Sequence, residues 1–150
     1  MPDKHRKNQF QFLIDSALSE RGLAQEKLGK LLAAELELNA QREALGAQRQ
    51  LAQAAIPLQG SVLSWKIRHT QIESIALQES RLGAQLVLLR ESIRTQKLVI
   101  GQIEQQIAGF QAVIDKWDKQ ESQALAIKAQ KNMDEFATRA WRRQLSEQVS

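Results

Sequence analysis

Residues 72–117 read "IESIALQESRLGAQLVLLRESIRTQKLVIGQIEQQIAGFQAVIDKW" and decide the fold. Steps of three and four residues alternate along this stretch and lead from one apolar side chain to the next. The series has fourteen positions, of which twelve are apolar: Ile72, Ile75, Glu79, Leu82, Leu86, Leu89, Ile93, Gln96, Ile100, Ile103, Ile107, Phe110, Ile114 and Trp117. A spacing that persists for about six heptads is typical of a coiled coil. The stretch therefore predicts a long helix whose apolar seam packs against another helix.

Two members of this seam, Glu79 and Gln96, are polar. One interpretation is that they fix the register, because a polar group in a coiled-coil seam penalises slipped pairings. The other is that both side chains lie at a solvent-accessible edge of the seam. The sequence favours neither over the other.

Composition extends the helical prediction to the whole chain of 150 residues, which is 43% hydrophobic but only 5% aromatic and has 7 Gly and 2 Pro. Strong helix formers dominate it. The clear break is "AAIPLQGSV" (54–62), where Pro57 ends one helix and Ser61 offers an N-cap for the next. We predict an all-α fold, a single coiled-coil hairpin over residues 1–150 with helices at about 8–56 and 62–145 and a turn at 57–61. The other glycines are interpreted as tolerated within the helices.

The first helix repeats less regularly than the second. One column of apolar residues recurs every seven positions: Phe10, Ala17, Ala24, Leu31, Leu38, Leu45 and Ala52. In its companion column Ile14 and Leu28 fit, but the other members are charged: Arg21, Glu35, Arg42 and Arg49. Leu32 and Leu36 lie off both columns, which suggests a stutter or a broader seam. A short turn makes antiparallel pairing of the two helices the expected arrangement.

The register of this hairpin leaves part of the second helix unpaired. With the turn centred near residue 59, residue i lies opposite about residue 118 − i, so that Leu31 faces the region of Val87 and Phe10 that of Ala108. Roughly 30 to 35 C-terminal residues then overhang as a single helix, given the rise of 1.5 Å per residue in both helices. Because an isolated helix cannot bury an apolar stripe, we expect another molecule to cover the overhang or its free form to be partly disordered.

Charge and residue types argue against catalysis. The net charge is +4, and there is no cysteine, so thiolate metal sites and cysteine nucleophiles are excluded. We expect His5 and His69 to have no acidic or nucleophilic partner at helical spacing, and neither a metal-ligand pattern nor a phosphate-binding glycine loop is present. We therefore expect no enzyme activity, no cofactor and no metal. The basic run "DKHRK" (3–7) is too short for a nucleic-acid-binding arm. No apolar run could cross a bilayer, and a cytoplasmic protein without membrane insertion is expected.

The overhang carries an unusual segment, "QKNMDEFATRAWRRQ" (130–144), in which the large apolar residues Met133, Phe136 and Trp141 lie among two acids and three arginines. Basic residues in a last helical turn can simply complement the helix dipole, worth about 0.3–1 kcal/mol each. The alternative is a surface for a partner. Within this segment, "KNMDEFATRA" (131–140) resembles the C-terminal signature of the flagellar export protein FliJ family, in the pattern K-x-M-D-E-F-A-x-R-A. The chain length, the two predicted helices and the spacing in "FLIDSALSERGLAQEKLGKLL" (12–32) are also similar to that family.

The resemblance implies a function that periodicity does not. FliJ and its virulence counterparts, SctO and YscO, form the central stalk of type III secretion ATPases. Their paired termini insert into the hexameric ATPase, and the remainder reaches the export gate protein FlhA or its equivalent. Export chaperones are further partners. The implied location is the cytoplasmic face of the secretion apparatus, as a monomer, in a flagellar or an injectisome system.

The same resemblance selects candidate contact residues. Those for the ATPase are Met133, Phe136, Arg139, Trp141, Arg142 and Arg143 in the C-terminal segment, with Lys4, Arg6 and Lys7 near the N-terminus. Those for the export gate are Trp65, Arg68 and Leu77, early in the second helix. Two alternatives stay open. One is a structural coiled coil that oligomerises through its own helices, and the other is a chaperone-like escort for export substrates.

Overall fold

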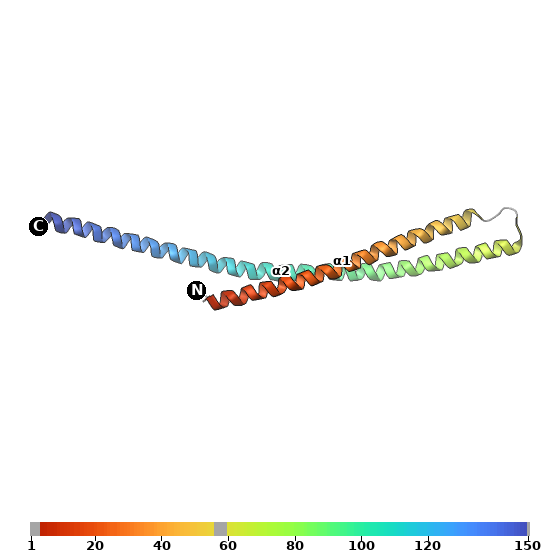
Figure 1. Ribbon diagram of the computed structural model, residues 1–150, viewed down its shortest axis with the longest axis horizontal. Helices are drawn as coiled ribbons and strands as arrows, with labels where there is room; N and C mark the ends of the chain where they lie inside the picture. The colour runs from red at the N-terminus through yellow and green to blue at the C-terminus, as the bar shows by residue number, and fades with distance from the viewer. Residues whose placement is uncertain (1–3, 56–59, 150) are drawn as a thin grey trace. The chain divides into compact units, whose positions relative to one another are not determined.

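The computed structural model describes residues 4–55 and 60–149, and this part of the chain consists of two α-helices. Helix α1 spans Lys4–Ala54 and helix α2 spans Val62–Val149 (Figure 1). The predicted all-helical class is confirmed, and so is the start of the second helix. The first helix begins about four residues earlier than predicted, so His5 lies inside α1. Of the predicted turn at 57–61, residues 57–59 lie outside the described residues.

The start of α2 is set by Ser61, as the sequence predicts. The backbone N–H of Ser64 donates a hydrogen bond to Ser61 Oγ at 3.1 Å, which satisfies one of the N–H groups left free at a helix start. The N–H of Trp65 donates to the Ser61 carbonyl, also at 3.1 Å. Ser61 is thus the N-cap of α2.

The chain divides into two compact units, each made of a segment of α1 and a segment of α2. Unit 2 comprises Ser19–Glu104. Its buried core holds five seam residues of α2 and two small residues of α1: Ile75, Leu86, Ile93, Gln96, Ile103, Ala24 and Ala52. The remaining predicted seam positions of this unit, Ile72, Glu79, Leu82, Leu89 and Ile100, are half-buried. The heptad prediction for α2 is confirmed here.

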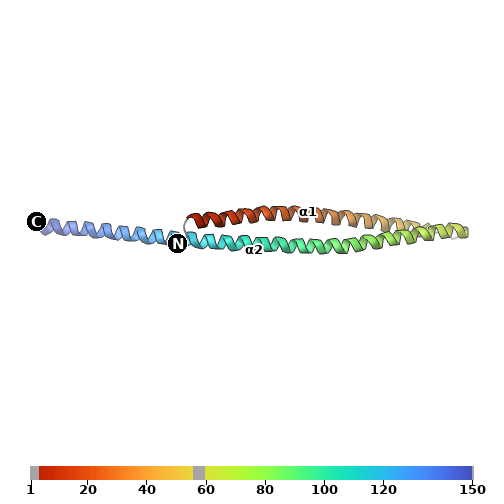
Figure 2. The same ribbon diagram turned by 90° about the horizontal axis from the view of Figure 1, so that it is seen from below.

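Contacts within unit 2 link α1 to α2 in opposite order. Ala24 contacts Gln96, Glu35 pairs with Arg90, and Arg49 pairs with Glu79. Residue numbers therefore rise along α1 as they fall along α2, and the two segments lie side by side (Figure 2). The predicted register places position 94 opposite Ala24, and the observed partner, Gln96, lies two residues beyond it. Leu31 was predicted to face the region of Val87, and this prediction is close, because Leu31 and Leu88 line the same groove.

Two charged residues of the companion column of α1 form ion pairs with α2. Glu35 Oε2 lies 3.6 Å from Arg90 Nε. Arg49 Nε lies 3.2 Å from Glu79 Oε1. Glu35, Arg49 and Glu79 are half-buried at the helix–helix boundary and Arg90 is exposed. Leu36 is 72% exposed. Cross-helix ion pairs thus occupy two of the four charged companion positions, while Arg42 is exposed, and the stutter or broader seam stays a prediction.

Gln96 is buried, with 7% of its surface exposed, and its side-chain amide donates a hydrogen bond to the Ala24 carbonyl at 3.0 Å. The solvent-edge interpretation is therefore wrong for Gln96. Glu79 is half-buried and paired with Arg49. Both polar seam residues contact the opposite helix, as expected of residues that fix a register.

Unit 1 comprises Met1–Leu18 and Gln105–Ser150. In it, Ile14 and Ala17 of α1 and Ile114 of α2 are buried, and Phe10, Ile107, Phe110 and Trp117 are half-buried. Beyond Glu121, which pairs with Lys7, α2 continues without a second helix beside it in the described chain (Figure 2). Every side chain from 118 to 148 is exposed. The predicted overhang is thus present, and it is helical throughout.

Candidate functional site

An aromatic and ionic cluster holds the start of α1 against α2 in unit 1. The Phe10 ring meets the Trp117 ring edge-on at a centroid distance of 4.9 Å and the Phe110 ring at 5.9 Å. Such perpendicular geometry is favoured by the ring quadrupoles. Lys7 Nζ donates to Asp118 Oδ1 at 2.7 Å and also to Glu121 Oε2. We call these residues, Lys7, Phe10, Phe110, Trp117, Asp118 and Glu121, the clasp.

The clasp changes the interpretation of Lys7, which the sequence offered as a candidate contact to an ATPase. Its side chain is 24% exposed, and both carboxylates that it meets belong to its own chain. The hydrogen bond to Asp118, followed by that to Glu121, raises the pKa of Lys7 above its usual value. Lys7 is therefore engaged within unit 1. Lys4 and Arg6 are exposed on the same turn of α1.

Beyond the clasp, residues 122–148 form a segment that we call the arm. Its large apolar side chains are open to solvent: Met133 is 68% exposed, Phe136 76% and Trp141 61%. Leu125, Ile127 and Leu145 are exposed as well. Few monomeric proteins leave a run of large apolar side chains uncovered without a role in binding. The arm is the candidate partner-binding surface.

The apolar stripe of the arm is not a continuation of the seam. If the three-and-four spacing is extended beyond Trp117, its positions become mostly polar: Glu121, Ala124, Lys128, Lys131, Glu135, Thr138, Arg142 and Leu145. At about 100° per residue, Met133 points some 160° away from the seam position Glu135. Phe136 and Trp141 flank Met133 at about 60° and 80° on either side. The side of α2 that packs in the helix pair thus becomes polar, and a new stripe opens on roughly the opposite side.

Small residues complete this new stripe. Ala126, Ala129, Ala137 and Ala140 lie on the same side of α2 as Met133, by the helical spacing, and all are exposed. Alanines between large side chains allow a covering element to approach the helix backbone closely. The sequence prediction named the large residues correctly but did not give the side of α2 on which they lie. The polar continuation of the seam was the signal that could have shown the change of face.

The three arginines lie beside the stripe rather than on it. By the same geometry Arg139 and Arg142 lie on the polar side of the arm. Arg143 is about 100° around the helix from Arg142 and lies next to Phe136, at the border of the stripe. Arg139 and Arg142 line a shallow surface groove of the arm together with Lys131, Asp134, Glu135 and Thr138. Asp134 accepts hydrogen bonds from two residues of the same helix. Gln130 Nε2 donates to its carboxylate at 3.2 Å, and Thr138 Oγ1 donates to its backbone carbonyl at 2.8 Å. The arm therefore presents an apolar side and a mixed side rich in basic groups.

The three candidates for a gate contact differ in their surroundings within unit 2. Trp65 stacks on His69 with ring centroids 4.9 Å apart and planes 6° apart, and it is about half exposed. His69 Nε2 in turn lies 3.3 Å from Glu73 Oε1. The expectation that His69 has no acidic partner at helical spacing is therefore wrong, because Glu73 lies four residues further along α2. Arg68 is half-buried rather than outward-facing, because it occupies the position that extends the seam backward. Leu77 is exposed. Trp65 and Leu77 remain candidates for outward contacts.

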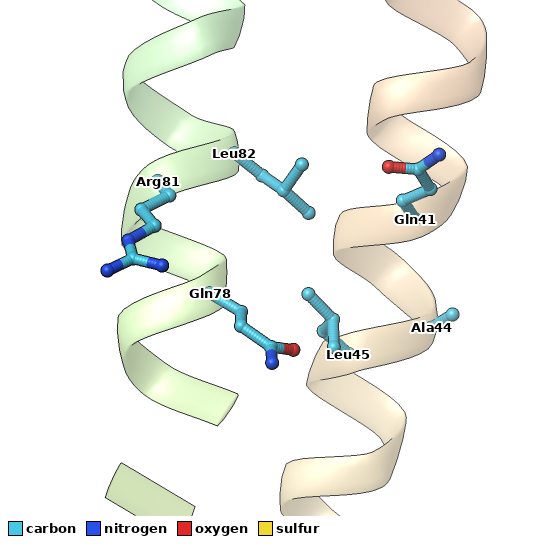
Figure 3. Close-up of a pocket in the computed structure, with 6 residues that line it drawn as sticks. All are labelled: Gln41, Ala44, Leu45, Gln78, Arg81 and Leu82. Carbon is cyan, nitrogen blue, oxygen red and sulfur yellow. The ribbon is translucent and has the colours of Figure 1, made fainter. Parts of the chain in front are cut away.

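A groove between the two helices of unit 2 has no catalytic constellation among its six lining residues. It has a volume of about 440 Å³, and Figure 3 shows Leu45 of α1 and Leu82 of α2 pointing toward one another across it. Gln41, Ala44 and Gln78 complete its lining, and Arg81 points away from the gap. This groove is part of the seam. Among the described residues, no group of three or more His, Cys, Asp and Glu side chains is placed to hold a metal ion.

Within residues 4–55 and 60–149, neither helix has a stretch apolar enough to cross a membrane. No family model, no curated protein and no solved structure matches the chain.

Proposed function

We propose that this chain is the central stalk of a type III secretion export ATPase, flagellar or of an injectisome, of the FliJ, SctO and YscO kind. In this proposal the two helices form an antiparallel coiled-coil hairpin. The arm enters the hexameric ATPase, promotes its assembly and turnover, and couples it to the export gate protein. The stalk has no active site and needs no cofactor. It works in the cytoplasm, at the face of the secretion apparatus.

The observation that carries the proposal is the exposed arm with its own apolar stripe. Met133, Phe136 and Trp141 are each more than half exposed, on a side of α2 that the helix pair does not use. A helix that only needed to pair with α1 would gain nothing from large apolar side chains there. A protein that surrounds the arm would bury them, at about 25 cal/mol per Å² of apolar surface removed from water.

The charges of the arm support a partner with acidic groups. Lys131, Arg139 and Arg142 share the groove on its mixed side, and Arg143 borders the apolar stripe. A ring-shaped partner can meet both sides of a single helix at once, the apolar stripe with one wall and the basic groups with another. A flat partner would cover one side only. The candidates for the gate contact, Trp65 and Leu77, lie in unit 2 and are separate from the arm.

The test adds the purified chain to the secretion ATPase of the same organism and measures hexamer formation and ATP turnover. Wild type should raise both. Reversal of three charges in the arm, in the variant Arg139→Glu/Arg142→Glu/Arg143→Glu, should abolish the effect with helicity unchanged. The matched control reverses three exposed charges of unit 2, Arg81, Arg94 and Lys97, and should act like wild type.

Three results would overturn parts of this proposal. If the wild-type chain changes neither assembly nor turnover, the stalk function is wrong. If it binds export chaperones while ATPase activity stays constant, the escort function replaces it. If the triple variant acts as well as wild type, the arginines only complement the helix dipole.

A further inference from the structure

The start of α2 extends beyond the end of α1. Arg49, five residues before the end of α1, pairs with Glu79, which lies seventeen residues after the start of α2. The first two to three turns of α2 therefore lie beyond the last residue of α1, within unit 2 (Figure 1). We call residues 62–69 of α2 the tip. All of its side chains are exposed except that of Arg68, which is half-buried.

The tip is rich in large apolar side chains that are open to solvent. Val62 is 71% exposed, Leu63 67%, Trp65 49% and Ile67 60%. By the helical repeat, these four side chains are spread over an arc of about 200° around α2 rather than along one stripe. Along the helix axis they lie within about 8 Å of one another. A partner with a flat face would cover one side of this helix end and leave the other sides in water.

The charges on and near the tip have one sign. Residues 44–72 contain Arg49, Lys66 and Arg68 and no acid. Arg49 is paired with Glu79, whereas Lys66 and Arg68 form no ion pair within residues 4–55 and 60–149. The first acid on α2 is Glu73, about 16 Å along the helix from the first residue of the tip. The apolar end of α2 is therefore combined with positive charge and is well separated from the nearest carboxylate on its own helix.

The order of side chains along the tip matches the order of layers at a bilayer surface. Two aliphatic residues come first, Trp65 and Lys66 follow, and the first acid comes only after the tip. Tryptophan collects at the membrane–water interface, and lysine and arginine extend their charged ends to the headgroups. Interfacial helices bury their apolar groups about 5–10 Å deep, which agrees with the length of the apolar end. A fluid surface can also enclose a helix end from all sides.

We propose that the tip docks on the surface of a membrane that contains anionic lipids. Val62, Leu63 and Ile67 enter between the headgroups, and Lys66 and Arg68 bind the negatively charged groups of the lipids. The lipid surface is favoured over a protein partner because the apolar side chains surround the helix and the charges beside them are all positive. This inference does not depend on the proposed stalk function, since its tests contain no ATPase.

The first test is co-sedimentation of the full-length chain with vesicles of phosphatidylcholine alone or of an equimolar mixture with phosphatidylserine. Wild type should bind the mixed vesicles about tenfold more tightly. Leu63→Glu/Ile67→Glu should weaken this binding about tenfold or more, because it puts two negative charges among the headgroups. The matched control is Leu88→Glu/Leu98→Glu, at two exposed leucines of α2 outside the tip, and it should bind like wild type with equal helicity.

The contribution of charge is tested by a single substitution in the tip. Lys66→Gln should weaken binding to the mixed vesicles about fivefold, because one cation near an anionic surface is lost. Lys97→Gln, at an exposed lysine of α2 outside the tip, is the matched control and should change binding little. Equal effects of the two variants would contradict the proposal, as would equally tight binding to vesicles with and without phosphatidylserine.

A third test locates the contact and uses the absence of cysteine from the chain. Leu63→Cys, Leu98→Cys and Phe136→Cys proteins each carry a fluorophore that brightens in an apolar environment. The mixed vesicles should increase the signal at position 63 and leave those at 98 and 136 unchanged. A signal at 136 without one at 63 would place the lipid contact on the arm and overturn the proposal. Absence of wild-type binding to either kind of vesicle would overturn it as well and would leave the tip as a surface for a protein.

Discussion

The side-chain amide of Gln96 donates a hydrogen bond to the backbone carbonyl of Ala24, across the helix pair of unit 2, at 3.0 Å. Ala24 is itself buried and small, so its carbonyl is open to a side chain from the opposite helix. The bond can form at one register only, since a shift of either helix would leave the amide buried among apolar side chains. A buried polar group without a partner costs about 1–3 kcal/mol.

Two substitutions at Gln96 should differ in their effect on the free energy of unfolding. Gln96→Ala should lower the free energy of unfolding by about 1–2 kcal/mol, because it removes the hydrogen bond and leaves space in the seam. Gln96→Leu should leave it unchanged or raise it, since leucine fills the seam without a desolvated amide. Urea denaturation followed by circular dichroism at 222 nm measures both. Equal destabilisation by the two variants would contradict this role for the amide.

The glycines in open parts of the helices offer a second prediction. Gly101→Ala and Gly109→Ala should each raise the free energy of unfolding by about 0.5–1 kcal/mol, because the added Cβ meets no atom within 4 Å and the unfolded chain loses freedom. Gly83→Ala should be tolerated as well, since its Cβ would lie 3.7 Å from the Arg42 guanidinium, an ordinary contact. Thermal unfolding of the three variants tests this. A loss of stability at Gly109 would show a close neighbour that the structure lacks.

Phe10 should be the main apolar anchor of the clasp. Phe10→Ala should destabilise unit 1 by about 2 kcal/mol, less than the 3–5 kcal/mol of a fully buried phenylalanine, because Phe10 is half-buried. It should also expose Trp117 and shift its fluorescence to longer wavelength. Phe12→Ala is the matched control, because Phe12 is 69% exposed and should change neither quantity. The same fluorescence change in both variants would rule out the Phe10–Trp117 contact as its source.

The Lys7 contacts predict a dependence of stability on alkaline pH. Because the pKa of Lys7 is raised in the folded chain, its contribution is complete below the unfolded-state pKa and is lost as the pH rises through the folded pKa. The stability gap between wild type and Lys7→Gln should stay constant from pH 7 to about 9 and narrow above about 10.5. Urea midpoints at each pH measure the gap. Lys97→Gln, an exposed lysine on α2, should show no comparable narrowing.

Periodicity predicted the seam of α2 well, because burial in a helix pair follows spacing alone. All fourteen positions from Ile72 to Trp117 are buried or half-buried. The partners of the charged residues could not be predicted in the same way. Glu35 pairs with Arg90 and Arg49 with Glu79, and these partners lie seven and ten positions beyond residues 83 and 69, which the estimate based on the turn gives.

The candidate site was predicted in part. The sequence located the exposed arm and its large apolar residues, because the first helix is too short to cover them. It did not show that Lys7 is held by Asp118 and Glu121, since both carboxylates are more than a hundred positions from Lys7 in the sequence. Nor did residue spacing identify a partner for the arm, because an apolar stripe gives the chemistry of a covering surface and not its source.

The most direct test of the stalk proposal is site-specific photo-crosslinking of the arm to the secretion ATPase. A single cysteine at Ala137, on the apolar stripe between Met133 and Trp141, carries the photoreactive label, and the control carries it at Leu98 in unit 2. The proposal predicts a cross-link to the ATPase subunit from position 137 that requires the assembled hexamer, and none from position 98. No ATPase product from position 137, or equal products from both positions, would contradict it.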